Sequence, residues 1–478
     1  MKRLSEKLVQ SWASLGPKFL PFADAATPDL PLSRLLRLSL FQVSVGMALV
    51  LLIGTLNRVM IVELHVPASL VAVMVSLPLL FAPFRALIGF RSDHHRSHLG
   101  WRRVPYIWMG TLLQFGGFAI MPFALLVLGG LGQASHAPPW VGHLGAGMAF
   151  LLVGAGLHTT QTAGLALATD IAPKETRPRV VALLYVMLLL GMVGASVIFG
   201  WLLSDYTHLR LVQVIQGAAF LTFVFNVIAL WRQEPRDPDR AREPVATPAF
   251  WDVWQRFTAP QSTRRLLWTI GLGTAAFSMQ DVLLEPYGGE ILGMPVGATS
   301  LLTAFWALGA LLAFGLAARR LRVGADPLRV AAGGLLTGLL AFAAVVLADP
   351  LGSPTLFKFG ALLIGFGGGL FSVGTLLAAM ALERTDNGLA LGAWGAVQAT
   401  AAGLAIAAGG ALCDLIGSYA EQGLLGPALV SKVSGYMFVY HVELGLLFAA
   451  LIAIGPLVRS TTGPKLVAER LGLADMPG

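Results

Sequence analysis

Twelve apolar stretches, each long enough to cross a bilayer as a helix, alternate along the chain with short polar segments. About 20 consecutive apolar residues suffice for one transmembrane helix. The predicted spans are 36–62, 68–90, 104–130, 141–171, 179–203, 211–231, 266–289, 296–318, 328–348, 355–382, 388–412 and 436–458. The pattern therefore predicts an all-α integral membrane protein with twelve transmembrane helices.

Lysine and arginine distinguish the two sides of this predicted membrane protein. The chain has 33 of them, and nearly all fall in cytoplasmic segments if both termini are cytoplasmic. Only Arg210, Lys358 and Lys432 then lie outside, while Arg58 and Arg85 lie within spans. Because an excess of basic residues marks cytoplasmic loops, we expect both termini to be cytoplasmic.

The composition changes this picture only by excluding alternatives. Hydrophobic residues make up 56% of the chain and charged residues 12%, against about 25% charged residues in a typical soluble domain. The net charge of +8 lies in loops that face the cytoplasmic lipid surface, so no nucleic-acid partner is expected. The single cysteine, Cys413, excludes a disulfide framework.

The longest polar segment divides the spans into two sets of six. It contains Glu-Pro, Asp-Pro and Thr-Pro steps, which indicate a linker. The predicted organisation is a cytoplasmic N-terminal interfacial segment (1–35), an N-terminal six-helix bundle (36–231), the cytoplasmic linker (232–265), a C-terminal six-helix bundle (266–458) and a cytoplasmic tail (459–478). Six-plus-six spans with parallel halves are the arrangement of the major facilitator superfamily.

A weak internal repeat supports the two-half arrangement. Gly46, Arg58 and Glu63 align at one offset with Gly273, Glu285 and Glu290, and Gly194, Gly200 and Asp205 align at a second offset with Gly403, Gly409 and Asp414. The loop after the second span adds a further sign, because Gly89-x-x-x-Asp93 followed by Arg102 and Arg103 resembles the loop motif of the same superfamily. We expect this loop to be a structural latch, with Asp93 at a neighbouring helix N-terminus and the arginines reaching cytoplasmic acids or lipid. Separately, Asp170, Glu175 and Arg177 are expected to cap the fourth span in a loop network.

Polar side chains inside the two lead helices form the first candidate site. Asn57 and Arg58 lie in the first span, and Gln280, Asp281 and Glu285 lie in the seventh. A charge inside the bilayer costs a few kcal/mol, so we predict a bidentate Arg58–Glu285 pair in the outer half of the membrane. The alternative is a purely structural clamp. Glu63 and Glu290 are expected to be solvated at the outer surface.

Four segments resemble one family within this superfamily. They are Gly54-Thr-Leu-Asn-Arg-Val-Met-Ile-Val-Glu63, Gly100-Trp-Arg-Arg-Val-Pro-Tyr-Ile107, Gln280-Asp-Val-Leu-Leu-Glu-Pro-Tyr-Gly-Gly-Glu290 and Gly365-Phe-Gly-Gly-Gly-Leu370. They are similar to the bacteriochlorophyll delivery (PucC/LhaA) family of purple phototrophic bacteria. The long N-terminal extension and the chain length resemble the LhaA members, associated with the core antenna, more than the PucC members.

The resemblance implies a role in assembling light-harvesting antenna. The expected activity is delivery of bacteriochlorophyll a to the antenna α and β polypeptides, with a carotenoid as a further ligand. The reaction centre, bacteriochlorophyll synthase and membrane lipid are the other expected partners. The expected location is the cell inner membrane or the intracytoplasmic photosynthetic membrane.

His158 is the candidate magnesium ligand for such a pigment. It lies in the fourth span beside Gln161 within a glycine-rich run, and small neighbours could admit a flat macrocycle. The alternative is a histidine bonded to a neighbouring helix. Trp394 and Gln398, four residues apart in the eleventh span, could stack on and hydrogen-bond a ring, or could pack in the core. His441 and Glu443 are weaker candidates.

No nucleophile–base or paired-carboxylate signature occurs in a catalytic setting, so no enzyme is predicted. Three functions remain open. The favoured one is a pigment-delivering assembly factor for antenna. The second is a proton- or cation-coupled secondary transporter of a small solute or pigment precursor, with Arg58, Asp281 and Glu285 in its site. The third is a pigment-free scaffold that recruits antenna and pigment-synthesis proteins.

Overall fold

The computed structural model describes residues 30–81, 88, 92, 101–130, 138–173, 176–234, 258–381 and 387–460, and the regular elements in these ranges are helices. Most of the predicted N-terminal interfacial segment, the middle of the predicted linker and the predicted tail beyond residue 460 lie outside the described residues. Arg85, Gly89 and Asp93 also lie outside them, so the first part of the predicted loop motif is not covered.

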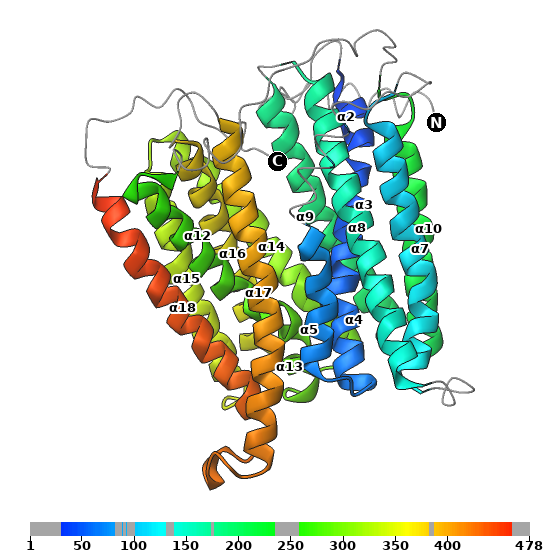
Figure 1. The fold of residues 1–478 in the computed structure, drawn as a ribbon, viewed down its shortest axis with the longest axis vertical. Helices are drawn as coiled ribbons and strands as arrows, with labels where there is room; N and C mark the ends of the chain where they lie inside the picture. Colours follow the sequence, from blue (N-terminus) through cyan, green and yellow to red (C-terminus); the bar gives the residue numbers. More distant parts are fainter. Residues whose placement is uncertain are drawn as a thin grey trace, which may run out of the picture.

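The N-terminal half begins with an irregular lead helix and continues with four long helices (Figure 1). Its elements are α2 (Leu32–Leu38), α3 (Leu40–Leu49), η2 (Val50–Thr55), α4 (Leu56–Arg58), η3 (Val59–Glu63), α5 (Ala68–Ser76), η4 (Leu77–Phe81), α7 (Val104–Leu128), α8 (Pro139–Ile171), α9 (Arg177–Leu202) and α10 (His208–Leu230). Prolines at the first turns of α7, α8 and α9 suit these starts, because the first N–H groups of a helix have no partner inside it.

The C-terminal half repeats the plan. Its elements are α12 (Gln261–Ser278), η6 (Met279–Val282), α13 (Leu284–Glu290), α14 (Val296–Arg322), α15 (Pro327–Ala348), α16 (Pro354–Met380), α17 (Asn387–Glu421), η7 (Pro427–Leu429) and α18 (Val433–Ser460). Here too the lead helix is irregular, since α12 passes through the short 3-10 turn η6 into α13.

Within the described residues, 10 helices are long and apolar enough to cross a membrane. They coincide with ten of the predicted spans. The predicted span 68–90 is described only as far as residue 81, and the predicted span 266–289 is interrupted at η6. The break at η6 was not predicted, because a 3-10 turn leaves the hydrophobic pattern of the sequence unchanged.

The two halves lie side by side and touch mainly through α9 with α14 and α5 with α17. In Figure 1 they approach each other at the lower end, where α4 and α13 lie; we call this the α13 end. Glycines allow the contact, since a Cβ on Gly200 would lie 2.8 Å from the Gly297 carbonyl oxygen, and one on Gly410 would lie 2.6 Å from that of Ala68. Close approach of backbones is the usual way in which helices pack in lipid.

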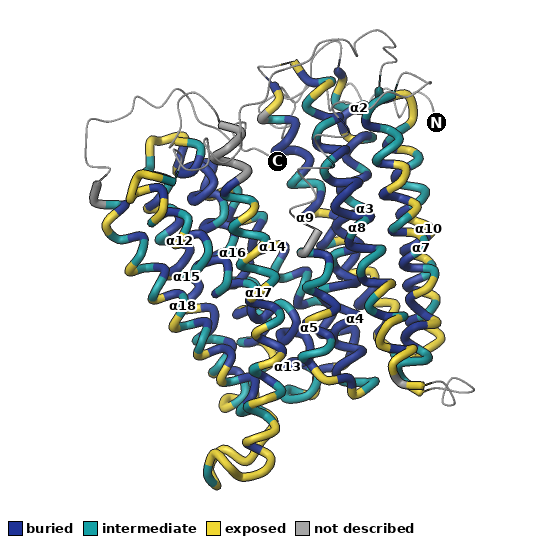
Figure 2. The backbone as a smooth tube through the Cα atoms, viewed as in Figure 1, coloured by how far each residue is buried: buried dark blue, intermediate teal, exposed yellow. Residues whose placement is uncertain are grey.

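Buried positions concentrate between the helices, and exposed ones lie on the outer faces of both bundles (Figure 2). Trp201, Trp268, Phe123 and Ile452 are each at least two-thirds exposed. So much exposed apolar surface is unfavourable in water but is expected where a protein faces lipid. The exposure therefore agrees with a multi-pass membrane protein.

Candidate functional site

The two lead helices are distorted at matching places, near the α13 end. In the first, the π-helical turns η2 and η3 flank the three residues of α4; in the second, η6 separates α12 from α13. Distorted turns free backbone groups from the regular hydrogen-bond ladder and often mark functional positions. One such group is the Asp281 carbonyl oxygen, which accepts a 3.1 Å hydrogen bond from the Asn57 side-chain amide. Asn57 also donates to the Ile53 carbonyl oxygen of its own helix.

Arg58 forms its ion pair with Glu63, not with Glu285. The predicted Arg58–Glu285 pair is therefore wrong in this structure, and so is the expectation that Glu63 is simply solvated. The Arg58 side chain is 5% exposed and that of Glu63 is 31% exposed. Pairing at this partly wetted position costs less desolvation than pairing with a fully enclosed carboxylate.

Arg58 also links the halves. Its Nη2 lies 3.5 Å from the Met294 carbonyl oxygen, and its guanidinium packs against Gly289, where a Cβ would lie 3.0 Å from Nε. Gly289 therefore provides the space that the guanidinium occupies. Both contacts cross from the N-terminal to the C-terminal half, so Arg58 helps to close the α13 end.

Glu285 is buried beside Thr303 of α14. Its Oε1 accepts a 2.6 Å hydrogen bond from the Thr303 hydroxyl, and its Oε2 has no hydrogen-bond partner in the described part of the chain. Gly54 makes room for this pair, because a Cβ there would lie 2.5 Å from the carboxylate and 2.7 Å from the hydroxyl. Thr303 and Gly54 were not predicted as site residues; no charge or spacing in the sequence singles them out.

Gln280 and Asp281 form the break itself. The Gln280 side-chain amide donates to Asp281 Oδ1 at 2.5 Å and to the Phe277 carbonyl oxygen at 3.2 Å. Of the five predicted polar residues, the structure thus brings Asn57 to the backbone of Asp281 and places Gln280 against the Asp281 carboxylate. Glu290 is not merely solvated either, because it accepts a 3.0 Å hydrogen bond from Tyr436 of α18.

Asp414 forms a second polar link between the halves, and sequence reasoning missed its role. From α17 it accepts hydrogen bonds from the backbone N–H groups of Ala68, at 3.1 Å, and Ser69, at 2.7 Å. These are orphan donors in the first turn of α5, where negative charge is also favoured by the helix dipole. The only sequence signal was the place of Asp414 in the internal repeat.

Tyr206 lies in the connection between α9 and α10, close to the Arg58–Glu63 pair. Burial and the Glu63 carboxylate raise the pKa of Tyr206 from 10.0 to about 12, and the Arg58 charge opposes the rise. Its hydroxyl lies 3.2 Å from His208 Nδ1. Tyr206 and His208 border a mostly apolar recess of about 20 Å³ between η3, α7 and α10, which has room for a water molecule but not for a larger ligand.

His158 and Gln161 are buried on α8, far along the chain from the lead helices. Two of the glycines near them are used for helix packing. A Cβ on Gly156 would lie 2.6 Å from the Gln114 amide nitrogen of α7, and one on Gly164 would lie 2.6 Å from the Phe41 ring. These contacts explain why two positions of the run are glycine, and His158 as a magnesium ligand stays a prediction.

Trp394 and Gln398 bond to α16 instead of facing an open site. The Trp394 indole N–H donates to the Thr375 hydroxyl at 3.2 Å, and the Gln398 amide donates to the Ser372 hydroxyl at 3.3 Å. Both side chains thereby join α17 to α16, so the core-packing alternative describes them better. His441 is exposed on α18 and bonds to the Met437 carbonyl oxygen of its own helix.

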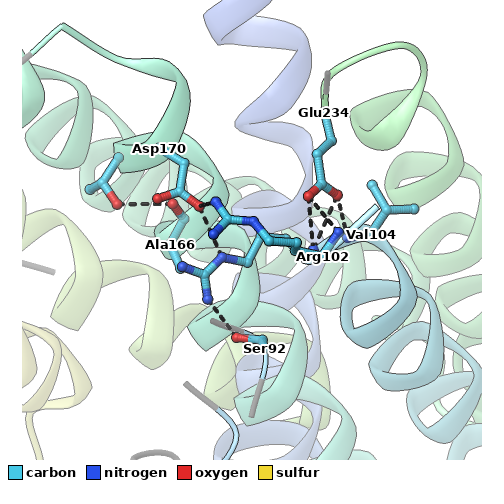
Figure 3. Close-up of polar contacts among 8 residues, drawn as sticks. Ser92, Arg102, Val104, Ala166, Asp170 and Glu234 are labelled. Carbon is cyan, nitrogen blue, oxygen red and sulfur yellow. Dashed lines mark hydrogen bonds and ion pairs between the residues drawn. The ribbon is translucent and has the colours of Figure 1, made fainter. Parts of the chain in front are cut away.

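Arg102 and Arg103, the described part of the predicted latch, form polar contacts at the other end of the N-terminal half (Figure 3). The Glu234 carboxylate accepts the backbone N–H groups of Arg102, Arg103 and Val104 at 2.7–3.1 Å, which caps the start of α7. Asp170 accepts from Arg103 Nε at 3.0 Å and from Arg102 Nη2 at 3.3 Å. These bonds join the start of α7 to the end of α8 and to Glu234. Asp170 was expected in a loop network, but its pairing with these two arginines and the part taken by Glu234 were not predicted.

Solved structures with the same fold are membrane transporters. A bacterial homologue of the human lysosomal transporter Spinster, in an inward-facing and unoccupied conformation, matches with a TM-score of 0.64 over 90% of this chain and 97% of its own, at 15% identity. A point mutant of the nucleoside transporter NupG matches with a TM-score of 0.66 over 88% and 99%, also at 15% identity. The chain is thus a multi-pass membrane protein with a major-facilitator fold.

Sequence comparison identifies the family within that class. The chain matches the PUCC protein family over residues 55–462, and it belongs to that family. It is 60% identical to Protein PucC of Rhodovulum sulfidophilum, covering 87% of this chain and 92% of the relative, and 55% identical to Protein PucC of Cereibacter sphaeroides, covering 98% and 100%. A more distant relative, at 28% identity over 80% of this chain and 88% of its own, is the bacteriochlorophyll synthase 44.5 kDa chain of Rhodobacter capsulatus.

Proposed function

We propose that this protein is a non-enzymatic assembly factor for bacterial light-harvesting antenna that delivers bacteriochlorophyll a to the antenna α and β polypeptides. The observation that carries the proposal is the match to the PUCC family over residues 55–462, which includes the segments that build the interface between the halves. The name of the more distant relative adds a link to bacteriochlorophyll. A carotenoid is a second proposed cargo.

The geometry supports a protein that opens and closes around a cargo. Polar contacts of Arg58, Asn57 and Asp414 hold the halves together at the α13 end. In this fold the halves rock against each other around a central site, so such contacts form and break as a group. His158, buried on α8 beside Gln161, remains the proposed magnesium ligand for the pigment.

The topology belongs to the proposal as well. Twelve spans with both termini cytoplasmic place the Glu234–Arg102 network on the cytoplasmic side and the α13 end outside, in agreement with the distribution of lysine and arginine. The proposed location is the cell inner membrane or the intracytoplasmic photosynthetic membrane. The proposed partners beyond the antenna polypeptides are the reaction centre and bacteriochlorophyll synthase, and the LhaA-like role at the core antenna is the one we favour.

Gentle purification from cells that are assembling antenna tests the proposal. The full chain is extracted into lipid nanodiscs, its absorption spectrum is recorded, and co-purifying polypeptides are identified by mass spectrometry. We expect bacteriochlorophyll absorption together with antenna polypeptides. The same preparation from cells that cannot make the pigment is the control and should lose the absorption but keep the protein.

Each other outcome decides between the alternatives. Antenna polypeptides without pigment would favour a scaffold that recruits proteins only. Neither pigment nor antenna polypeptides, from actively assembling cells, would overturn the proposal.

A proton- or cation-coupled transporter of a small solute or pigment precursor is the second candidate. It is favoured by the transporter fold and by Glu285 Oε2 at the interface, which has no hydrogen-bond partner among the described residues. Uptake by proteoliposomes that is abolished in Glu285→Gln would support it. Glu421→Gln, at the exposed end of α17, is the matched control and should leave uptake unchanged.

A further inference from the structure

Glu443 is a fully buried carboxylic acid in the middle of α18, away from the Arg58–Glu63 pair. It is 0% exposed, no side chain in the described residues gives either of its oxygens a hydrogen bond, and the donor beside it is a neutral backbone group, the Gln280 N–H. An ionised carboxylate without a partner costs several kcal/mol in a medium of low dielectric constant. A carboxyl that stays buried in this way is therefore neutralised, either by a proton or by a metal cation.

The Glu443 carboxyl faces the break in the seventh predicted span. The backbone N–H of Gln280 and the Asp281 carboxyl are its electrostatic neighbours there, and α18 packs on η6. Two more buried polar atoms near it lack partners in the described part of the chain, Gln280 Oε1 and the Tyr440 hydroxyl. The region is thus a small cluster of buried polar groups between α18 and a helix that is already interrupted.

Four elements pack against α18, namely α12, α15, α17 and η6. In the described part of these elements, no Lys or Arg side chain forms an ion pair with Glu443. The arginines of α12 and α15 stand in their first turns, and Asp414 of α17 is occupied by the N-terminus of α5. The titratable groups in reach are Asp281 on η6 and Tyr440 on α18, with Tyr287, Tyr436 and Cys413 around Tyr440.

A proton fits this site better than a metal ion. Among the described residues, no three His, Cys, Asp or Glu side chains are placed to hold a metal. Two carbonyl oxygens of the break are also committed, since that of Gln280 accepts the Leu283 N–H at 2.8 Å and that of Asp281 accepts from Asn57. Too few oxygens remain to replace the water around a sodium ion, whereas a single proton neutralises the carboxyl.

We propose that Glu443 is a proton-binding site, loaded in this conformation and emptied when movement of the Met279–Val282 turn gives the carboxyl water or a donor. The turn joins the part of the seventh span that packs on α18 to the part that contacts α4, so the same movement alters the interface between the halves. The inference goes beyond the proposed function, because it holds whether the cargo is a pigment, a solute or neither.

Labelling with dicyclohexylcarbodiimide tests the proposal on the full chain in nanodiscs. This apolar reagent reacts with protonated carboxyls in apolar surroundings, and peptide mass spectrometry locates the adduct. We expect the peptide that contains Glu443 to be labelled, with labelling falling about tenfold per pH unit above its midpoint and unchanged by added sodium ions. Glu443→Gln should lose that adduct, while Glu421→Gln should keep it.

The wild-type peptide map is informative even if Glu443→Gln fails to fold. Protection of Glu443 by sodium ions at constant pH would replace the proton by a metal cation and overturn the proposal. Absence of the Glu443 adduct at every pH, in protein whose circular dichroism shows it folded and whose Glu285 or Asp281 peptide is labelled, would overturn it too.

Discussion

Arg58 shows how one residue can satisfy an expensive charge locally and still serve the whole molecule. Its guanidinium pairs with Glu63 five residues further along the same helix, while the remaining contacts go to Met294 and Gly289 across the interface. The ion pair lowers the free-energy cost of burying the guanidinium, and the same guanidinium makes the contacts that join the two halves. Glu285 keeps its own partner, Thr303.

Replacing the arginine should therefore destabilise the protein more than replacing an arginine in an exposed pair. We expect Arg58→Met to lower the free energy of unfolding by about 2 kcal/mol, the usual cost of losing hydrogen bonds to a charged group. Arg210→Met is the control, because its partner Asp205 is 87% exposed and such pairs contribute less than about 1 kcal/mol. Thermal unfolding in nanodiscs measures both, and equal small effects would contradict the role given to Arg58.

Tyr206 gives the same region a dependence on pH. The folded protein favours the neutral phenol, whose pKa is raised to about 12, so its contribution to stability is complete below pH about 10 and is lost as the pH rises toward 12. Glu63→Gln removes one cause of the rise and should lower the pKa of Tyr206, as followed by tyrosinate absorbance. Tyr206→Phe should abolish that transition; an unchanged titration in Glu63→Gln would contradict the assignment.

At the scale of the elements, interruptions decide what the lead helices do. A continuous helix would satisfy all its backbone groups internally and would present a smooth face to the other half. The π-helical turns of the first span and the 3-10 turn of the seventh instead expose carbonyl oxygens, one of which accepts from Asn57. The first turn of α5 plays the complementary part, because its free N–H groups receive Asp414.

Loss of this cap should be visible at the two amides themselves. In Asp414→Ala we expect the backbone N–H groups of Ala68 and Ser69 to exchange with deuterium faster, with a loss of about 1 kcal/mol in stability. Asp326→Ala is the matched control, because Asp326 caps α15 through the Leu328 N–H at 2.9 Å and should affect that helix only. Unchanged exchange in residues 66–72 would show that Asp414 does not hold α5.

For the whole molecule, the important property is that two compact halves meet through small residues and a few polar contacts. Gly200 and Gly297 bring α9 against α14, and Gly410 brings α17 against α5. Buried apolar side chains of both halves, such as Val59 and Leu284, also belong to one continuous core, so the interface combines apolar packing with a few polar contacts.

Widening one contact should separate the halves without unfolding them. We expect Gly297→Leu to lengthen the distance between spin labels attached at Leu209 and Leu351, which are exposed residues of the two halves, in a Cys413→Ser background. Gly315→Leu lies on the same helix with nothing within 4 Å of its Cβ and should leave the distance unchanged. Identical distance distributions in both variants would argue against this contact as part of the closure.

The sequence by itself determined the helices, the two halves and the family, because hydrophobic length, basic loops and local motifs are properties of the chain read in order. It also indicated which side chains are unusual for a membrane, among them Arg58, Asp281 and Glu285. Only the tertiary structure decided their partners. Whether Glu63, Thr303 or another group becomes the partner of a buried side chain depends on packing at the scale of ångströms. Glycines permit that packing, since Gly54 leaves room for Glu285 beside Thr303 and Gly289 leaves room for Arg58. For the same reason only the structure showed that Gly156 and Gly164 lie against Gln114 and Phe41 of neighbouring helices.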